Sequence, residues 1–261
     1  MPSSKREREY ERRRYEKWQE RQAVKRAQRR RQRIIAGAVA AVLVLGVGAT
    51  TAVLLGRDDS DATADATGTP TATSTAATIG GEARTGNDGE VPDASLAEDR
   101  TWTGDLTLNT GDIGFELDGK AAPQAVANFV TLAQEGYFDG TDCHRLTTDG
   151  LFVLQCGDPT ATGTGGPGYT FGPVENAPAD GVYPAGTIAM ARSTAEDSQG
   201  SQFFIVYEDT ELPTDGGGYT VFGQVTSGLD VIQAIADAGV VDGATDGQPA
   251  NRVTIEGVET Q

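Results

Sequence analysis

The chain has 261 residues, which allows one domain of ordinary size plus further segments, because domains cluster at roughly 100–200 residues. Its formal net charge of −17 is uneven: residues 1–33 carry a net +9 and the remainder −26, so the acidic part repels phosphate backbones and only the basic N-terminus could bind nucleic acid. Two cysteines and one histidine are too few for a structural zinc site, and neither a metal nor another cofactor is expected.

The first 33 residues form a basic segment that we expect to be helical and cytoplasmic. Residues 5–33 mix charges of both signs with Tyr10, Tyr15 and Trp18 and contain no Gly or Pro, a pattern typical of a charged juxtamembrane helix. Contact with anionic lipid or a cytoplasmic partner is one interpretation. A determinant of membrane topology and nothing more is the other, and we prefer it.

Residues 34–55 predict a transmembrane helix. They are 22 consecutive residues without a charge, long enough to span about 30 Å of hydrocarbon. A cleavable signal peptide would have a shorter apolar region, roughly 7–15 residues, behind a short basic start. Arginines precede the run, and Asp58, Asp59 and Asp61 follow it. The charges therefore predict a single-pass protein of the cell membrane, with its N-terminus in the cytoplasm and its C-terminal part outside.

Residues 56–100 are expected to form a disordered linker. They are dominated by Asp, Ala, Thr, Gly and Pro, and they contain too few large apolar residues to bury a core.

Residues 101–261 predict one mainly β domain. Short strand-like runs are separated by Gly, Pro, Asn and Asp. The eight expected strands are 105–108, 112–117, 141–147, 151–156, 187–192, 202–207, 220–226 and 251–258. This pattern favours a closed eight-stranded antiparallel barrel capped by two α-helices, because closure removes exposed sheet edges.

The two expected helices follow from their apolar stripes and end signals. The first begins near Pro123 and stops at Gly136. The second has Ser227 as a candidate N-cap, with Leu229 and Ile232 facing inward, and it ends at Gly239.

Two familiar kinds of active site are not supported by the sequence, one because of strand geometry and one because its motif is incomplete. The single histidine, His144, directly follows Cys143, and neighbours in a regular strand point to opposite faces, so a Cys-His pair cannot form. The run ATGTGGPG at 161–168 lacks the Gly-Lys-Ser/Thr ending of a phosphate-binding loop and is expected to be a tight turn.

Three segments together carry a more specific signal. They are Cys143-His144-Arg145-Leu146, Phe152-Val153-Leu154-Gln155-Cys156-Gly157-Asp158 and Gly200-Ser201-Gln202-Phe203-Phe204-Ile205, accompanied by Asn128-Phe129 and Val221-Phe222-Gly223. In order and spacing they resemble the signature of the cyclophilins over about residues 103–258. The resemblance implies a barrel capped by two helices that binds proline-containing polypeptides.

The resemblance also implies roles for individual residues. Arg145 matches the catalytic arginine, and Phe152, Val153 and Phe204 match the pocket for the proline ring. The remaining matches are Gln155 and Gln202, which hold the arginine and the peptide backbone, Gly163 at the neighbouring pocket, Ala191 and Arg192 along the substrate chain, and Tyr219, where many members have histidine. His144 is left as structural.

The chemistry of such a set can be stated without the family. Rotation about an amide faces a barrier of about 18–20 kcal/mol, because the nitrogen lone pair is delocalised into the carbonyl. A fixed guanidinium that hydrogen-bonds the prolyl nitrogen localises the lone pair and stabilises the twisted state. We therefore expect an X-Pro isomerase acting on exported or envelope proteins. The alternatives are a proline-peptide binding module with little turnover and a structural tether.

Several residues depart from the family's pattern. Cys143 stands where Phe is frequent, Arg192 where an Asn-like residue is usual, and Leu212 near a position that often holds Trp. Because that Trp helps to bind cyclosporin, weak cyclosporin sensitivity is implied, with turnover of small peptides retained.

Cys143 and Cys156 are expected to form a disulfide. They lie near-opposite on consecutive strands of a hairpin, and thiols outside the cytoplasm tend to oxidise. Strict alternation, however, puts the two on different faces, so the bridge requires a β-bulge near His144. Two buried thiols are the alternative.

Overall fold

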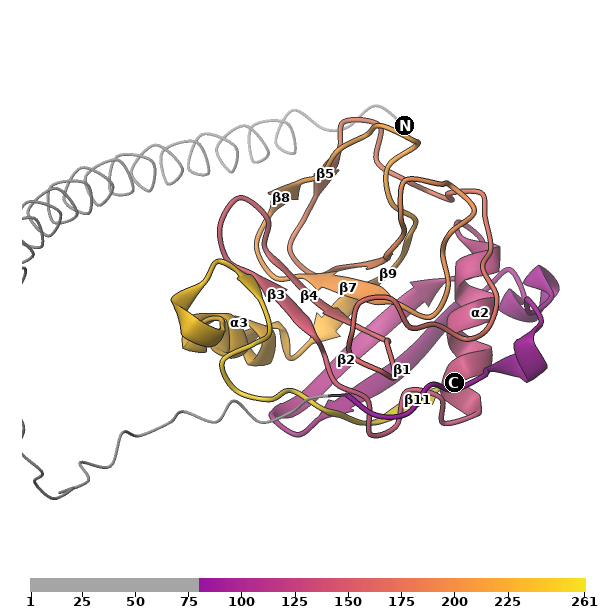
Figure 1. Cartoon of the computed structure of the whole chain (residues 1–261). Coiled ribbons are helices and arrows are strands. Elements are labelled where there is room, and N and C mark those ends of the chain that lie inside the picture. Colours follow the sequence, from indigo (N-terminus) through magenta and orange to yellow (C-terminus); the bar gives the residue numbers. More distant parts are fainter. Residues whose placement is uncertain (1–79) are drawn as a thin grey trace, which may run out of the picture. The chain divides into compact units, whose positions relative to one another are not determined.

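A computed structural model describes residues 80–261 (Figure 1). The expected basic helix over 1–33, the expected transmembrane helix over 34–55 and the first part of the expected linker, 56–79, lie outside the described residues. Within residues 80–261, no helix is both long enough and apolar enough to cross a bilayer.

The frame of the domain is a curled antiparallel sheet of nine strands, in the order β10-β3-β4-β7-β6-β9-β2-β1-β11. Its strands are β1 (Thr101–Leu108), β2 (Gly111–Asp118), β3 (Arg145–Thr147), β4 (Val153–Cys156), β6 (Thr187–Met190), β7 (Phe203–Val206), β9 (Val221–Ser227), β10 (Asp246–Gly247) and β11 (Ile255–Thr260). A separate pair joins β5 (Val182–Tyr183) to β8 (Thr210–Glu211). Each of the eight predicted strands overlaps a strand of the large sheet. The missed strands β5, β8 and β10 have two residues each, too few for any periodic pattern.

The predicted closure into an eight-stranded barrel is not what the structure shows. The hydrogen-bonded order is open, with β10 and β11 at its ends. The segment before β3 meets the start of β11 through an isolated bridge between Asp142 and Thr254 and three backbone hydrogen bonds, one of which runs from the Gly140 N–H to the Ile255 carbonyl at 2.7 Å. In the other two, the Cys143 N–H donates to the Val253 carbonyl at 2.9 Å and the Ile255 N–H donates to the Thr141 carbonyl at 2.8 Å. The edges therefore touch over a few residues without forming a continuous ladder.

Both predicted helices are present, α2 (Pro123–Gln134) and α3 (Leu229–Ala238), and they lie far apart in Figure 1. Phe129 of α2 enters the centre of the main core, where its ring lies 5.3 Å from Phe203 and 5.4 Å from Phe222. On the inner face of α3, the side chains of Ile232 and Ile235 are buried. The apolar stripes seen in the sequence therefore face the curled sheet.

The start of α3 differs from the prediction. Ser227 is the last residue of β9, and Gly228 is the N-cap, with φ of +77° and no capping side chain. A Cβ at Gly228 would lie 2.2 Å from the Asp112 carbonyl oxygen. Close packing of this turn on β2, together with its left-handed backbone, accounts for the glycine.

The last part of the predicted linker is folded. Residues 80–100 contain two short 3₁₀ helices, η1 (Asn87–Gly89) and η2 (Ala94–Ala97), and Ala97 is fully buried. The Gly86 N–H donates to the Pro167 carbonyl at 3.0 Å, and the Trp102 indole donates to the Ala97 carbonyl at 2.9 Å. This segment is held by backbone hydrogen bonds and close approach instead of large apolar side chains, so its composition did not reveal it.

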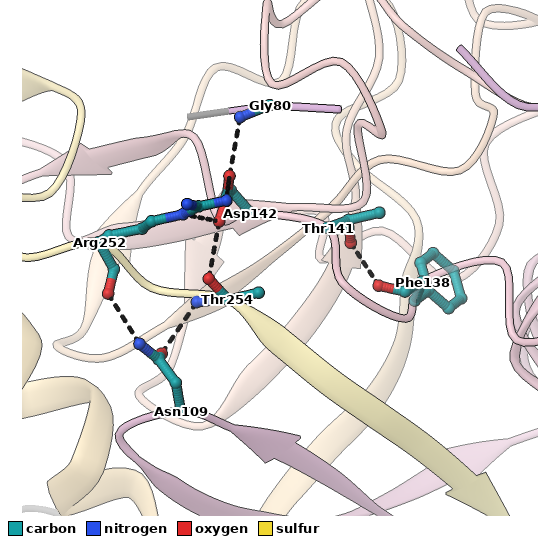
Figure 2. A network of polar contacts seen from close by, with 7 residues as sticks. All are labelled: Gly80, Asn109, Phe138, Thr141, Asp142, Arg252 and Thr254. Atoms are coloured by element: carbon teal, nitrogen blue, oxygen red, sulfur yellow. Dashed lines mark hydrogen bonds and ion pairs between the residues drawn. The ribbon is translucent and has the colours of Figure 1, made fainter. Parts of the chain in front are cut away.

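A buried carboxylate connects this segment to the meeting point of the sheet edges (Figure 2). Asp142 is 1% exposed and accepts from the Gly80 N–H at 2.8 Å. It also accepts from Arg252 at 2.9 and 3.0 Å and from the Thr254 hydroxyl at 2.8 Å. Asn109, between β1 and β2, in turn bonds the backbone of Arg252 and Thr254. One side chain thus joins three distant parts of the domain.

Candidate active site

A second, smaller apolar cluster lies on the face of the sheet opposite the main core. Alternation along β7 sends Phe203 and Ile205 into the core and Phe204 and Val206 to this second face. The cluster consists of Val153, Tyr183, Ala189, Phe204, Val206 and Leu212, with Leu151, Ala191, Tyr219 and Val221 packed against it. Its covering is incomplete, and a cleft remains.

This cleft has a volume of about 140 Å³. It is lined by Arg145, Leu151, Val153, Gln155, Ala191, Arg192, Phe204, Leu212 and Tyr219. Apolar side chains and one guanidinium thus share a small concave surface, as is typical of ligand sites in which a few polar groups set orientation.

Arg145 is held from two sides. Its Nε and Nη2 donate to the two carboxylate oxygens of Asp246, each at 2.8 Å, and its Nη1 donates to Gln155 Oε1 at 3.3 Å. The hydrogen bonds with Asp246 raise the pKa of Arg145 above its ordinary value and lower the pKa of Asp246. Both groups are therefore charged at neutral pH.

A chain of amides continues from the arginine. Gln155 Nε2 donates to Gln202 Oε1 at 2.8 Å, and Gln202 Nε2 donates to the Gly165 carbonyl at 2.8 Å. Gln155 sits opposite Arg145 in the β3–β4 register and opposite Phe204 in the β4–β7 register. The register therefore brings the guanidinium, the amides and the apolar floor together.

Tyr219 and Arg192 form the other wall. The Tyr219 ring lies edge-on to Phe204, with centroids 5.5 Å apart, and the Arg192 guanidinium lies 5.1 Å from its centroid. Arg192 Nε donates to the Gly218 carbonyl, and Nη2 donates to the Asp215 carbonyl at 3.1 Å. The side chain of Arg192 thus bonds to two backbone carbonyls of the loop that precedes Tyr219 and stabilises that loop.

A larger cleft of about 400 Å³ adjoins the first and shares Gln155, Ala191 and Arg192 with it. Gly163 and Gln202 line this second cleft, where the sequence placed Gly163 at a neighbouring pocket. Apart from Phe152, the predicted site residues therefore divide between two adjoining clefts.

Asp158 organises the loop that borders the second cleft. Its carboxylate accepts from the Thr160 N–H at 2.8 Å and the Gly165 N–H at 3.0 Å. Burial raises the pKa of Asp158, but the hydrogen bonds from the Thr160 hydroxyl and from the Gly165 and Thr160 N–H groups outweigh it and leave the pKa below its ordinary value. A Cβ at Gly165 would lie 2.0 Å from Asp158 Oδ1, so the loop needs glycine there.

His144 contributes no second charge to the site. Its side chain is buried beneath Gly163, and burial lowers its pKa, so it is neutral at pH 7. This agrees with the structural role that the sequence suggested for it.

Residues 103–260 match the family described as cyclophilin type peptidyl-prolyl cis-trans isomerase/CLD. The chain belongs to this family. Its cyclophilin domain carries the matched segments on the strands and loops that line the two clefts.

Curated bacterial relatives are similar over the same domain. The chain is 46% identical over 167 residues to the probable peptidyl-prolyl cis-trans isomerase B of Mycobacterium tuberculosis, covering 59% of this chain and 52% of that protein. It is 45% identical over 140 residues to peptidyl-prolyl cis-trans isomerase B of Bacillus subtilis, covering 53% of this chain and 94% of that protein. The chain thus matches about half the length of the mycobacterial relative and nearly all of the Bacillus one.

Solved structures agree on the fold. A cyclophilin type peptidyl-prolyl cis-trans isomerase of Cryptosporidium parvum superposes with a TM-score of 0.53 at 27% identity, covering 62% of this chain and 98% of that one. Its structure in the presence of the dipeptide Ala-Pro superposes with a TM-score of 0.52 at 29% identity, covering 61% and 98%.

Phe152 differs from its expected place in the cyclophilin domain. It belongs to the main core and packs edge-on against Tyr207, with centroids 6.0 Å apart, and it does not line the cleft. Leu151 lines the cleft instead. Val153 and Gln155 share one face of β4, so alternation brings Leu151 to that face and turns Phe152 inward. The period of the strand could have revealed this, but the motif match obscured it.

Asp246, like Leu151, is a residue of this site that the sequence did not indicate. It lies 101 residues from Arg145 in the chain, in a Gly- and Asp-rich stretch with no distinguishing pattern. Only the pairing of β10 with β3 brings it to the arginine.

Cys143 and Cys156 are joined by a disulfide next to the site. The expected β-bulge is absent from the β3–β4 ladder, which ends at the Arg145–Gln155 pair. Cys143 lies beyond that end and bonds to Val253 instead. Leaving the ladder frees Cys143 from strict alternation, so its sulfur can turn toward the core, where both cysteines are buried.

Reduction of this disulfide should lower the free energy of unfolding by about 2–3 kcal/mol, because the bridge closes a loop between residues 13 apart in the chain. Urea unfolding with and without reductant measures the effect. A Cys143→Ser/Cys156→Ser variant is the control and should not respond to reductant. Mass spectrometry after alkylation without reductant checks the bridge itself, and two labelled cysteines would contradict it.

Proposed function

We propose that this chain catalyses cis/trans isomerisation of X-Pro peptide bonds. The observation that carries the proposal is the guanidinium of Arg145 at the rim of an apolar cleft formed by Val153, Phe204 and Leu212. Membership of the cyclophilin family supports it, as does the Ala-Pro dipeptide named for the similar Cryptosporidium protein.

In this proposal the cleft binds the proline ring while Arg145 acts on the prolyl nitrogen. The barrier of about 18–20 kcal/mol falls when the nitrogen lone pair is localised on its own atom. A guanidinium N–H bonds that lone pair better in the twisted state than in either planar state, which is the differential binding that catalysis requires. Arginine suits this role because it stays charged and its donors are rigid.

The other residues of the cleft support the same step. Val153, Phe204 and Leu212 clamp the ring and exclude water, which strengthens the effect of the nearby charge. Gln155 holds Arg145 and is itself held by Gln202. The step transfers no proton and forms no covalent bond to the protein, so it needs neither a base nor a metal.

A peptide-binding module with little turnover is the second candidate, because the same cleft could dock a proline segment. The two candidate functions are distinguished by measuring, with the same protein, the rate of cis/trans exchange of an Ala-Pro peptide and the affinity for that peptide. An isomerase accelerates exchange in proportion to enzyme concentration, and a module binds without acceleration. Any fragment used should begin at or before residue 80, because residues 80–100 pack onto the domain.

We further propose that the domain acts outside the cytoplasm on exported or envelope proteins, anchored by residues 34–55. The uncharged run of 22 residues and the charge step across it support this. The disulfide supports it as well, because disulfides persist in oxidising compartments. Uncatalysed X-Pro isomerisation takes tens to hundreds of seconds, slow enough to limit the folding of such clients.

A protease added to intact cells should therefore remove epitopes within 101–261 and spare an epitope within 1–33. The positive flank before residue 34 retains the N-terminus in the cytoplasm, beyond the protease. Immunoblotting against both ends measures this, and permeabilised cells, in which both epitopes disappear, are the control. Recovery of the domain as a free soluble protein cut near residue 56 would instead indicate a cleaved signal peptide.

A further inference from the structure

The N–H groups of the Arg145 guanidinium are only partly used by hydrogen bonds within the protein. Three of its five N–H groups are used: Nε and one on Nη2 by the Asp246 carboxylate, and one on Nη1 by Gln155. One N–H on each of Nη1 and Nη2 has no protein partner among the described residues. Those two donors are the ones left for a bound peptide.

Asp246 reaches the arginine through the edge of the sheet. In the β10–β3 ladder it sits opposite Thr147, and Gly247 sits opposite Leu146. Arg145 lies two residues from Thr147 on the same face of β3, so it is the diagonal neighbour of Asp246, within reach of a long side chain. The Thr148 N–H donates to the Thr245 carbonyl at 2.9 Å and extends this pairing.

The geometry of the pair is that of a clamp. A carboxylate that accepts from both Nε and Nη fixes the plane of the guanidinium as well as its position, which a single hydrogen bond does not. The side chains of Arg145 and Asp246 are 39% and 54% exposed, and ion pairs so exposed contribute little to the stability of a fold. The pair is therefore better suited to orienting Arg145 than to stabilising the domain.

We propose that Asp246 is a positioning residue for isomerisation, holding the plane of Arg145 so that its remaining N–H groups face the prolyl nitrogen. This rests on the proposed function and specifies which side chain prepares the arginine. Without Asp246 the guanidinium keeps only the 3.3 Å bond to Gln155 and samples other rotamers. Loss of orientation lowers the rate while the apolar cleft still binds the ring.

The test uses the full-length chain in detergent and measures kcat by exchange NMR of an Ala-Pro peptide, with Kd by calorimetry. Asp246→Asn keeps the shape of the side chain and removes the carboxylate fork. We expect kcat to fall about 10-fold while Kd stays within twofold. Asp242→Asn is the matched control: Asp242 is exposed in the neighbouring 3₁₀ helix η3 (Val241–Gly243) and has no bond to Arg145, so it removes the same charge without touching the clamp.

A double-mutant cycle separates positioning from a structural role. In the Arg145→Ala background, Asp246→Asn should leave kcat unchanged, because the group it orients is gone. An equal fall in both backgrounds, or an unchanged or raised kcat in Asp246→Asn alone, would overturn the proposal. A wild-type chain that does not accelerate exchange, or whose kcat is unaffected by Arg145→Ala, would instead overturn the proposed function.

Discussion

Arg145→Ala should lower kcat/KM for an Ala-Pro peptide by about 5-fold to 150-fold, or roughly 1–3 kcal/mol of transition-state stabilisation. Two guanidinium groups line the cleft, and Arg192 directs four of its five N–H groups at the backbone carbonyls of Gly218, Ser193, Thr194 and Asp215, whereas Arg145 directs none at a backbone carbonyl. No other cation that lines this cleft can take its place. An exchange or protease-coupled assay measures the loss.

Arg145→Lys is the informative companion to this variant. Lysine keeps the charge, but its single ammonium group cannot donate to both carboxylate oxygens of Asp246 in the fixed plane of a guanidinium and also donate in a fixed direction to the peptide. We expect a kcat/KM between those of wild type and Arg145→Ala, with the thermal unfolding midpoints of all three proteins close together. Wild-type efficiency in Arg145→Ala would remove the catalytic assignment.

Asp142→Ala should lower the free energy of unfolding by about 3–4 kcal/mol. Its carboxylate is buried and accepts four hydrogen bonds (Figure 2), and its loss leaves the Gly80 N–H and the Thr254 hydroxyl unpaired beside a cation. Urea unfolding at pH 7 measures the change. Asp139→Asn, an exposed carboxylate in the same loop, is the control and should unfold like wild type.

The same carboxylate predicts a pH dependence. Burial raises the pKa of Asp142, but hydrogen bonds from Arg252, Gly80 and Thr254 outweigh it, so its pKa lies below that of the unfolded chain. A depressed folded pKa gives stability that is present above the unfolded pKa of about 3.9 and lost as the pH falls through the folded pKa. The difference in the free energy of unfolding between wild type and Asp142→Asn should therefore become smaller below about pH 4. If this difference in the free energy of unfolding stays constant down to pH 2, the charge of Asp142 contributes nothing to the stability of the domain.

The amino-acid sequence alone located the two helices and the main strands of the large sheet, and its resemblance to a known family indicated most of the residues that line the cleft. The resemblance to the cyclophilins placed Val153, Gln155 and Phe204 at one site, and these three residues line the cleft together, whereas Phe152, placed there as well, packs in the main core. End signals at Pro123 and Gly239 located α2 and α3 within one or two residues. These features follow from local periodicity and backbone conformation, which the sequence encodes directly.

Only the tertiary structure decided the features that depend on pairs distant in the chain. Asp246 meets Arg145 because β10 pairs with β3, and residues 80–100 fold because Gly86 and Ala97 find partners on the domain surface. A two-residue strand and a polar segment held by backbone hydrogen bonds leave no periodic pattern in the sequence. Both are stabilised by contacts with residues far away in the chain, which the local sequence does not specify. The cleft and its candidate catalytic arginine were therefore readable in the sequence, whereas the clamp that orients the arginine was not.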